Sequence, residues 1–364
     1  MMFSIRRQMT RLLSVSALAS FEISGASWVV LMAARGFSMM EIGIAEGAFH
    51  VASLLFEIPS GVISDVFGRR KSMILSCVMR LTSMLLMIFS KGLPGVCLSL
   101  AFAAFSYNFA SGAREALAYD SLKSVGQEAH YIRYSAIEMM LYRVGSALAT
   151  LLAGFALWLG YKRANMVDFL IGLICLWVTF GLREVETEGM QSEGSMGVRI
   201  AQCFRDAFSF LRRERKTVKI MLANALAGAI AILISFFLQA QLPLAGLEGR
   251  YLGPALFVMG LGGAAGSQLA VRFVKMGYKR LYALCLGGVL LGLAMGVSGW
   301  PLMMTAGGFI AGMFDDLLQV RTDALLNDRF PSSQRATLLS VSSLCFSLVM
   351  IAMSPLAGWF FDHI

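Results

Sequence analysis

The residues best suited to chemistry are charged side chains that stand inside long apolar stretches. Glu22, Arg80 and Arg143 interrupt such stretches in the first half of the chain, and Asp315 and Asp316 interrupt one in the second half. An ionisable group in hydrocarbon costs about 2.5–3.5 kcal/mol even on mild insertion scales, and such groups commonly mark substrate, ion or proton pathways. These residue types therefore favour binding and proton transfer over bond-breaking catalysis.

Motifs for enzymatic chemistry are absent from the sequence. It contains no GxxxxGK[ST] loop, HExxH helix, GxSxG elbow or GxGxxG turn after a strand. The six cysteines are scattered singly, without a CxxC pair or a histidine cluster, so neither a disulfide framework nor a metal site is indicated. We expect no enzyme activity, no cofactor and no metal, and any transport would run on a gradient rather than on ATP.

The composition explains what must position these charges. Of the 364 residues 57% are apolar and 15% are charged, and the mean hydropathy is +0.71. These values exclude a water-soluble fold, and the apolar residues fall into runs of about 20, enough for a helix to cross the bilayer. We therefore predict an all-α, multi-pass membrane protein. In such a protein the net charge of +9 indicates the orientation of the chain in the membrane and not nucleic-acid binding.

Eleven membrane-spanning helices are expected from the apolar runs. With a cytoplasmic N-terminus, 24 of the 31 Lys and Arg lie in inner segments and five in outer loops, which fixes the orientation by the positive-inside rule. The first run is too long for a cleaved signal peptide, so it is expected to remain as a span of the plasma membrane, the bacterial cytoplasmic membrane. The predicted spans are residues 12–34, 42–64, 72–90, 94–116, 134–158, 164–182, 217–242, 251–274, 281–298, 301–322 and 336–361.

One polar segment divides the spans into six and five. We predict a six-helix bundle over 1–182, a cytoplasmic linker over 183–216 and a five-helix bundle over 217–364. Within the linker, apolar residues recur every three to four positions among arginines, which suits either an amphipathic helix on the inner membrane surface or a solvated connection. Those apolar residues are Ile200, Phe204, Phe208 and Leu211.

The two halves resemble each other in the polar segments that follow corresponding spans. The segment Arg114-Glu-Ala-Leu-Ala-Tyr-Asp120 follows the fourth span, and Arg321-Thr-Asp-Ala-Leu-Leu-Asn-Asp328 follows the tenth, about 200 residues later. Membrane carriers are often built from repeats with the substrate site between them. These matched segments therefore favour a carrier built from two related halves.

A distinctive loop joins the second and third spans. It reads Gly61-Val-Ile-Ser-Asp65-Val-Phe-Gly68-Arg69-Arg70-Lys71. Asp65 at a helix C-terminus faces the negative end of the dipole, so it should need partners from Arg69, Arg70, Arg114 or another helix N-terminus. Gly61 would let a second helix approach closely, and Gly68 would permit the positive φ of a tight return.

This loop resembles the GxxxDxxGR[RK] signature of the major facilitator superfamily, and the neighbouring EIPSG and SGAREALAYDSL segments resemble uncharacterised, drug-carrier-like members. The resemblance implies a fold of two pseudo-symmetric helical bundles that rock to give alternating access. It also implies that the first, fourth, seventh and tenth spans line the cavity, and that Asp65 helps to latch the outward-facing state with Gly61, Gly68, Arg69, Arg70 and Arg114.

The sequence departs from the family pattern in three places. The corresponding second-half loop has Val274 where an aspartate would fall, the fifth span has Gly145 and Gly154 but no Gly-Pro step, and a twelfth span is missing before Ile364. We expect a weak second latch and no support for antiport from the fifth span. A natural loss of the last helix and a truncation both stay open.

Two of the intramembrane charges are expected to pair. Glu57 and Arg80 lie at similar depth on neighbouring antiparallel spans, so a structural ion pair is predicted between them. Glu22 lies at the middle of the first span with no basic residue nearby on its own helix. It is a candidate for proton coupling or substrate binding, with a pair to Arg143 as the alternative.

The remaining candidates are polar side chains on other spans. Asp315 and Asp316 point about 100° apart on the tenth span, so only one is expected to face the cavity. Glu46 and His50 are four residues apart and could relay a proton or share a local hydrogen bond. Tyr107 and Asn108 could contact substrate or bond between helices.

Together these observations predict a secondary carrier that moves a small organic solute, with proton-coupled efflux as one mode. The acidic balance of the candidate cavity favours a cationic or neutral amphipathic substrate. A monomer in the lipid bilayer is expected, with no nucleic-acid partner. The alternatives are a non-transporting membrane sensor or assembly protein, and a truncated, inactive carrier.

Overall fold

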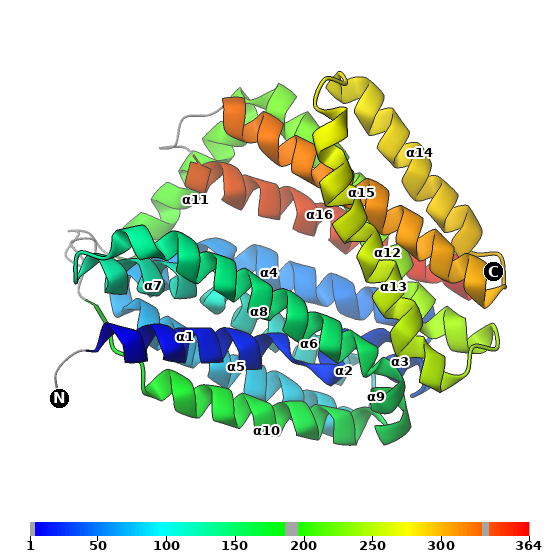
Figure 1. Cartoon of the computed structure of the whole chain (residues 1–364), viewed down its shortest axis with the longest axis horizontal. Coiled ribbons are helices and arrows are strands. Elements are labelled where there is room, and N and C mark those ends of the chain that lie inside the picture. Colours follow the sequence, from blue (N-terminus) through cyan, green and yellow to red (C-terminus); the bar gives the residue numbers. More distant parts are fainter. Residues whose placement is uncertain (1–3, 186–195, 330–334, 364) are drawn as a thin grey trace. The chain divides into compact units, whose positions relative to one another are not determined.

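The computed structural model describes residues 4–185, 196–329 and 335–363, and these residues are almost entirely helical, with no strand among them (Figure 1). The helices from the first half of the sequence are α1 (Ile5–Ser20), α2 (Ile23–Ala26), α3 (Trp28–Ala33), α4 (Met39–Phe67), α5 (Arg69–Phe89), α6 (Leu93–Ala110), α7 (Ala113–Lys123), α8 (Tyr131–Leu151), α9 (Ala153–Leu159) and α10 (Tyr161–Phe180). Those that follow are α11 (Met196–Arg213), α12 (Arg215–Leu244), α13 (Gly249–Leu269), α14 (Tyr278–Gly296), α15 (Pro301–Arg329) and α16 (Arg335–Asp362). The prediction of an all-helical protein is confirmed.

The helices have the length and composition of membrane spans. Eight helices of the described chain are long and apolar enough to cross a bilayer, and a ninth span results if α8 and α9, bent by 52° at their junction, are taken together. In hydrocarbon every backbone N–H and C=O must be satisfied within the protein, and a helix achieves this within one segment. The apolar runs of the sequence therefore fold as helices.

The first predicted span is not one continuous helix. Helix α1 ends at Ser20, and the C-cap residue Phe21 has φ −98° and ψ 85°, outside the helical region. The chain resumes as the four-residue α2 and breaks again at Ser27, before α3. Serine and glycine in this stretch have low helix propensity. The break exposes backbone groups around Glu22 that other helices must satisfy.

The described chain forms two compact units. Unit 1 contains Met1–Ala26, Ala48–Ala149 and Lys162–Arg205, and unit 2 contains Ser27–Gly47, Thr150–Tyr161 and Asp206–Ile364. The short segments 27–47 and 150–161 thus cluster with helices from the second half of the sequence, although the sequence pattern places them in the first six spans.

The core of unit 1 is built around α1, α5, α7 and α10, and α1, α5 and α10 run alongside one another in Figure 1. Side chains from all four helices, with Tyr134 of α8, make one buried cluster. Its members include Leu12, Val15, Met73, Cys77, Leu117 and Cys175. This packing holds α5 and α10 against the first span, and both helices then supply the polar groups of the site.

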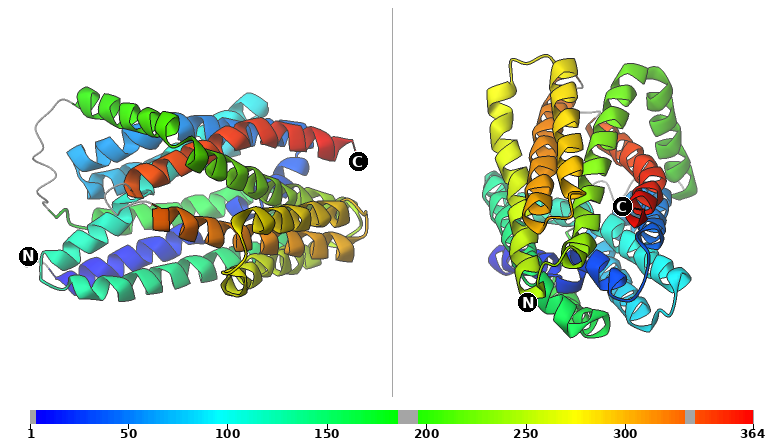
Figure 2. Two further views of the ribbon diagram at one scale, coloured as in Figure 1. Left: turned by 90° about the horizontal axis from the view of Figure 1, so that it is seen from above. Right: turned by 90° about the vertical axis from the view of Figure 1, so that its right-hand side faces the viewer.

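Unit 2 is held by close contacts between α13, α14 and α15, the yellow to orange helices in Figure 2. A Cβ added at Gly262 or Gly266 of α13 would collide with the backbone carbonyl of Phe309 or Met313 on α15. Similarly, a Cβ at Gly288 of α14 would collide with the Phe314 ring. Glycine allows helix backbones to approach closely in membranes, so these glycines form the packing faces between α13, α14 and α15.

The segments of unit 2 that come from the first half of the sequence pack on its long helices. Val30 of α3 and Ala153 of α9 belong to the same buried cluster as Leu252 of α13 and Leu238 of α12. The Trp28 ring meets the Phe236 ring edge-on at 6.0 Å. This region of unit 2 is consequently a tightly packed end where α3 and α9 contact α12 and α13.

Candidate functional site

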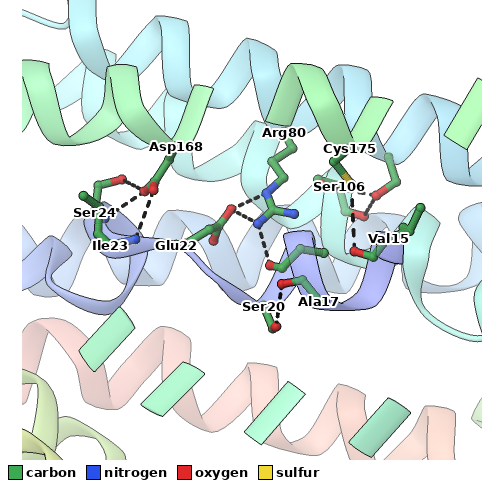
Figure 3. A network of polar contacts seen from close by, with 12 residues as sticks. Val15, Ala17, Ser20, Glu22, Ile23, Ser24, Arg80, Ser106, Asp168 and Cys175 are labelled. Carbon is green, nitrogen blue, oxygen red and sulfur yellow. Dashed lines mark hydrogen bonds and ion pairs between the residues drawn. The ribbon is translucent and has the colours of Figure 1, made fainter. Parts of the chain in front are cut away.

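The break in the first span is the polar centre of unit 1 (Figure 3). Arg80, from the middle of α5, donates through Nε and Nη2 to Oε1 of Glu22, which follows the end of α1. The same guanidinium donates to the carbonyl of Ala19 at 2.6 Å. Arg80 therefore satisfies both the Glu22 charge and a carbonyl freed by the end of the helix.

A second carboxylate holds the other side of the break. Asp168 on α10 accepts hydrogen bonds from the backbone N–H groups of Ile23 at 3.0 Å and Ser24 at 2.8 Å, and from the Ser24 hydroxyl at 2.5 Å (Figure 3). It is buried, with 1% of its surface exposed. A carboxylate bonded to N–H groups at the start of a helix is well stabilised there. Asp168 thus caps the resumed helix and fixes the position of Glu22.

Sequence reasoning missed Asp168. It is the sole acidic residue of the predicted span 164–182, and that was the available signal. Its partners are backbone groups, which no residue pattern reveals. Glu138 on α8 was missed as well: it accepts from Ser16 Oγ at 2.9 Å and pairs with Arg114 Nε at 2.5 Å.

The signature loop between α4 and α5 is organised by Asp120 and Glu184. Arg69 forms an ion pair with Asp120 of α7. Glu184 accepts from the backbone N–H groups of Arg69 at 2.9 Å and Arg70 at 3.0 Å, at the N-terminus of α5. A carboxylate is favourable at that end of a helix because of the dipole and the unsatisfied N–H groups. The loop is therefore closed by two carboxylates from later in the chain.

The predictions for this loop have different outcomes. Gly68 has φ +101°, so the expected positive φ is confirmed. The close helix approach expected at Gly61 is not found, because a Cβ added there would have no described atom within 4 Å. The Asp65 side chain lies outside the described residues. All three arginines expected as its partners have other contacts: Arg69 pairs with Asp120, Arg114 pairs with Glu138, and Arg70 donates to the Phe180 carbonyl at 2.9 Å.

Arg80 takes a different partner from the one expected. The sequence placed it opposite Glu57 from depth alone, but its ion pair is with Glu22. Depth along a helix does not fix rotation about the helix axis, and the break in the first span brings Glu22 onto Arg80. The alternative pair between Glu22 and Arg143 is also not formed, and Arg143 is exposed on α8.

The other candidates of the first half separate into structural and exposed groups. Asn108 is buried and exchanges hydrogen bonds with Ser53 of α4, donating to its carbonyl at 2.8 Å and accepting from its hydroxyl at 3.0 Å. Tyr107, the preceding residue, is 61% exposed. Glu46 and His50 lie one turn apart on α4, where His50 is buried and packs edge-on against Phe49 at 5.3 Å.

The acidic pair of α15 points toward two different helices. Oδ1 of Asp315 lies 3.3 Å from where a Cβ would stand at Gly228 of α12, whereas a Cβ at Gly263 of α13 would meet the Asp316 carboxylate. Within the described residues, Asp315 takes part in no hydrogen bond or ion pair, and the charge acting on it is that of Asp316. Asp315 is therefore the carboxylate that faces α12 without a counter-ion among those residues.

A chain of polar contacts continues from this level along α12 and α15. Asn224 donates to Gln319 at 2.6 Å, and Gln319 donates to Asp323 at 3.1 Å, one turn further on. Thr322 donates to Asn224 at 2.9 Å. Polar groups at this spacing lie on one side of α15. Asp315 and Gln319, four residues apart, begin that side.

The family follows from this helical architecture together with the sequence match. The sequence matches the Major Facilitator Superfamily over residues 12–274 and 245–364. The chain belongs to this superfamily, and it is a multi-pass membrane transporter with the fold of that family.

Known proteins agree with this assignment. An uncharacterised transporter of the family from Bacillus subtilis (strain 168), YxaM, is 21% identical over 325 residues, which cover 87% of this chain and 79% of YxaM. A mutant of the nucleoside transporter NupG superimposes with a TM-score of 0.78 at 12% identity, covering 98% of this chain and 96% of NupG. A D-xylose–proton symporter gives 0.68 at 15% identity, covering 96% and 87%. At these identities the structures show a common fold only.

Proposed function

We propose that this protein is a proton-coupled carrier of a small organic solute that works by alternating access. The observation that carries the proposal is the broken first span, where Glu22 sits at the break, bound to Arg80 and flanked by a second carboxylate, Asp168. Discontinuous helices with charged residues at the break are the usual place for substrate and coupling ions in secondary carriers.

The Glu22–Arg80 pair is proposed as the element that responds to solute. Both side chains are partly open, with 32% of Glu22 and 18% of Arg80 exposed. A solute that binds either partner, or a proton that neutralises Glu22, would release the Arg80 guanidinium from Glu22 and from the Ala19 carbonyl. The last turn of α1 would then lose this hydrogen-bond donor, so binding would change the geometry of the first span.

Asp315 is proposed as the site that takes up the proton or a substrate cation. It has no ion pair to break among the described residues, and its α15 segment carries no Lys or Arg between Pro301 and Val320. A carboxylate of this kind can exchange its charge state without dismantling an ion pair. The acidic character of α15 supports a cationic or neutral amphipathic solute, the substrate class of a drug-carrier-like branch.

The packed end of unit 2 is proposed as the outer gate. With a cytoplasmic N-terminus, the end that holds α3 and α9 faces the outside. A Cβ at Gly253 of α13 would collide with the Leu151 carbonyl, and one at Gly43 of α4 would collide with that of Ser354 on α16. These backbone contacts would have to separate for the carrier to open outward.

Flux through purified protein in proteoliposomes tests the proposal. A pH-sensitive dye inside the vesicles is followed while cationic, neutral and anionic solutes are added in turn. We expect a cationic or neutral solute to drive proton movement in the native protein, and Glu22→Gln to remove that movement. Glu22→Asp keeps the charge and should retain part of it.

The matched control is Glu248→Gln. Glu248 pairs with Arg250 at 2.8 Å outside the spans, and both side chains are well exposed, so its loss should leave flux unchanged. Flux driven only by anionic solutes would contradict the proposed substrate class. Full coupling in Glu22→Gln would remove Glu22 from the mechanism, and folded protein without flux for any solute would contradict the carrier proposal.

A further inference from the structure

Helix α11 has two chemically distinct sides that the transport mechanism does not use. It runs for 18 residues and lies outside the helices that are apolar enough to span a membrane. At ~100° per residue, Ile200, Phe208 and Leu211 fall on one side. The other side carries Gln202, Arg205, Ser209, Arg212 and Arg213. Within the linker, Met196–Arg213 is a helix with an apolar side and a charged side, and its position on the inner membrane surface stays a prediction.

The apolar side is incompletely covered by protein. Phe208 is 54% exposed, Ala201 is exposed, and Ile200 and Leu211 are half-buried. An amphipathic helix with an aromatic side chain left in solvent gains by placing that side in the boundary between headgroups and acyl chains. The apolar side therefore has the chemistry of a membrane-surface helix.

The polar side has the charge that an anionic surface would attract. Arg205, Arg212 and Arg213 are all exposed, and the Arg212 guanidinium lies 4.4 Å from the centre of the Phe208 ring, at the border between the two sides. Three further exposed cations follow directly at the start of α12: Arg215, Lys216 and Lys219. Clusters of this size beside a membrane helix attract anionic lipids.

We propose that α11 is a docking helix for the inner leaflet, with its apolar side in the lipid boundary and its arginines bound to anionic phospholipid headgroups. The Arg212–Phe208 stack places the guanidinium at headgroup level while the ring enters the apolar region, as long basic side chains do at interfaces. Because α11 leads into α12 through Glu214 alone, docking would also fix where the first helix of the second half begins.

Depth measurements on the full-length protein test this proposal. Nitroxide labels are placed on Phe208→Cys and, separately, on Ser209→Cys, with Cys97 and Cys203 replaced by serine because the other cysteines, Cys77, Cys175, Cys285 and Cys345, are buried. The protein is reconstituted in phosphatidylcholine vesicles with or without phosphatidylglycerol. Collision with oxygen reports lipid contact, and collision with a soluble nickel chelate reports water contact.

With phosphatidylglycerol we expect a several-fold higher oxygen-to-chelate ratio at position 208 than at position 209. Substituting Arg205, Arg212 and Arg213 together with Gln should remove most of the difference. High salt should do the same when the three arginines are kept, because it screens their charges. The matched control replaces Lys275, Lys279 and Arg280, three exposed cations between the end of α13 and the first turn of α14, and should keep the difference.

Two results would overturn the proposal. Equal chelate access at positions 208 and 209 in phosphatidylglycerol vesicles would show that α11 does not enter the lipid boundary. The same protection of position 208 in pure phosphatidylcholine and in detergent would show that protein, or apolar contact alone, covers the helix. Circular dichroism of each variant confirms that the helical fold is retained before the labels are compared.

Discussion

The charges inside the helices of unit 1 and unit 2 are treated differently. In unit 1, Glu22 is bound by Arg80, Glu138 by Arg114, and Asp168 by backbone N–H groups. In unit 2, Asp315 has no hydrogen bond or ion pair within the described residues. Both units contain carboxylates at helix centres, and these three of unit 1 have partners that hold them in place, whereas Asp315 has none among the described residues.

This difference separates carboxylates that are held in one geometry by partners from a carboxylate that can change its charge state without breaking an ion pair. A carboxylate bound to arginine or N–H groups stabilises one geometry, and removing one member of such a pair leaves an uncompensated charge. A carboxylate without a partner contributes less to the fold and is available for a proton or a cation. Unit 1 therefore provides a polar network around the broken span, and unit 2 provides Asp315, which has no ion pair among the described residues.

Replacing Asp315 should have the largest effect on transport of any substitution in unit 2. Asp315→Asn removes the charge but keeps the shape, so we expect solute-driven proton flux to fall by about 100-fold or more, the scale of losing a proton-transfer group. The thermal stability in detergent should change little. Asp316→Asn is the matched control, since Asp316 points toward α13. If Asp316→Asn abolished flux and Asp315→Asn did not, the assignment of the free carboxylate would be reversed.

Breaking the ion pair of unit 1 should instead cost stability. Arg80→Gln leaves Glu22 without its counter-ion, and we expect a loss of about 1–3 kcal/mol, below the ~3–5 kcal/mol of a fully buried pair because Glu22 is partly exposed. The double variant Arg80→Gln/Glu22→Gln should recover much of that loss. Thermal denaturation of the four proteins gives the coupling energy as a double-mutant cycle. Strictly additive losses would mean that the pair contributes nothing.

The spans of this protein were predictable because hydropathy is averaged over many residues. Long apolar runs indicate helices regardless of detail. The same averaging hid the break at Phe21–Glu22. The serines and glycine near residue 22 lower helix propensity, but the break is stabilised by Asp168, which lies 145 positions away in sequence and outside any local window.

Partner choice was the part that sequence could not supply. The sequence placed Glu57 opposite Arg80 and left Arg143 as a partner for Glu22, because depth in the membrane limits a residue to a level but not to a side of its helix. For the same reason, the sequence did not decide which of Asp315 and Asp316 faces the cavity. In both cases the deciding quantity is the rotation of one packed helix against another, which is set by contacts along the whole interface.

The cap on the broken span gives a smaller test of unit 1. Asp168→Ala removes the acceptor for Ile23 and Ser24, and we expect a loss of about 1–2 kcal/mol, the range for a helix cap in a buried setting. Asp168→Asn keeps one acceptor oxygen and should lose less. Thermal denaturation of both variants provides the measurement. Equal losses for the two would indicate that the charge, and not the hydrogen bonds, is what the break requires.

The smallest effect is expected at a carboxylate of unit 2 that does have partners. Asp362 at the end of α16 accepts from the backbone N–H groups of Met39 at 2.7 Å and Met40 at 2.8 Å, at the start of α4. There, Ser38 and Glu41 already form a capping box, with bonds of 3.1 and 2.9 Å. Asp362→Ala should therefore cost only about 0.5–1 kcal/mol.

Hydrogen exchange followed by mass spectrometry resolves this local effect. In Asp362→Ala the amides of Met39 and Met40 should exchange faster, while peptides from the middle of α4 keep the native rate. Ser38→Ala is the control, because it removes the bond that Glu41 N–H donates to the Ser38 hydroxyl and leaves the Asp362 contacts intact. If Asp362→Ala lowered solute-driven flux as strongly as Asp315→Asn, having a partner would not distinguish structural from functional carboxylates in unit 2. An effect confined to these two amides would support the distinction. Asp315 and Asp362 are both acidic and lie on the last two helices, α15 and α16, of the same unit, and among the described residues they differ in having a partner.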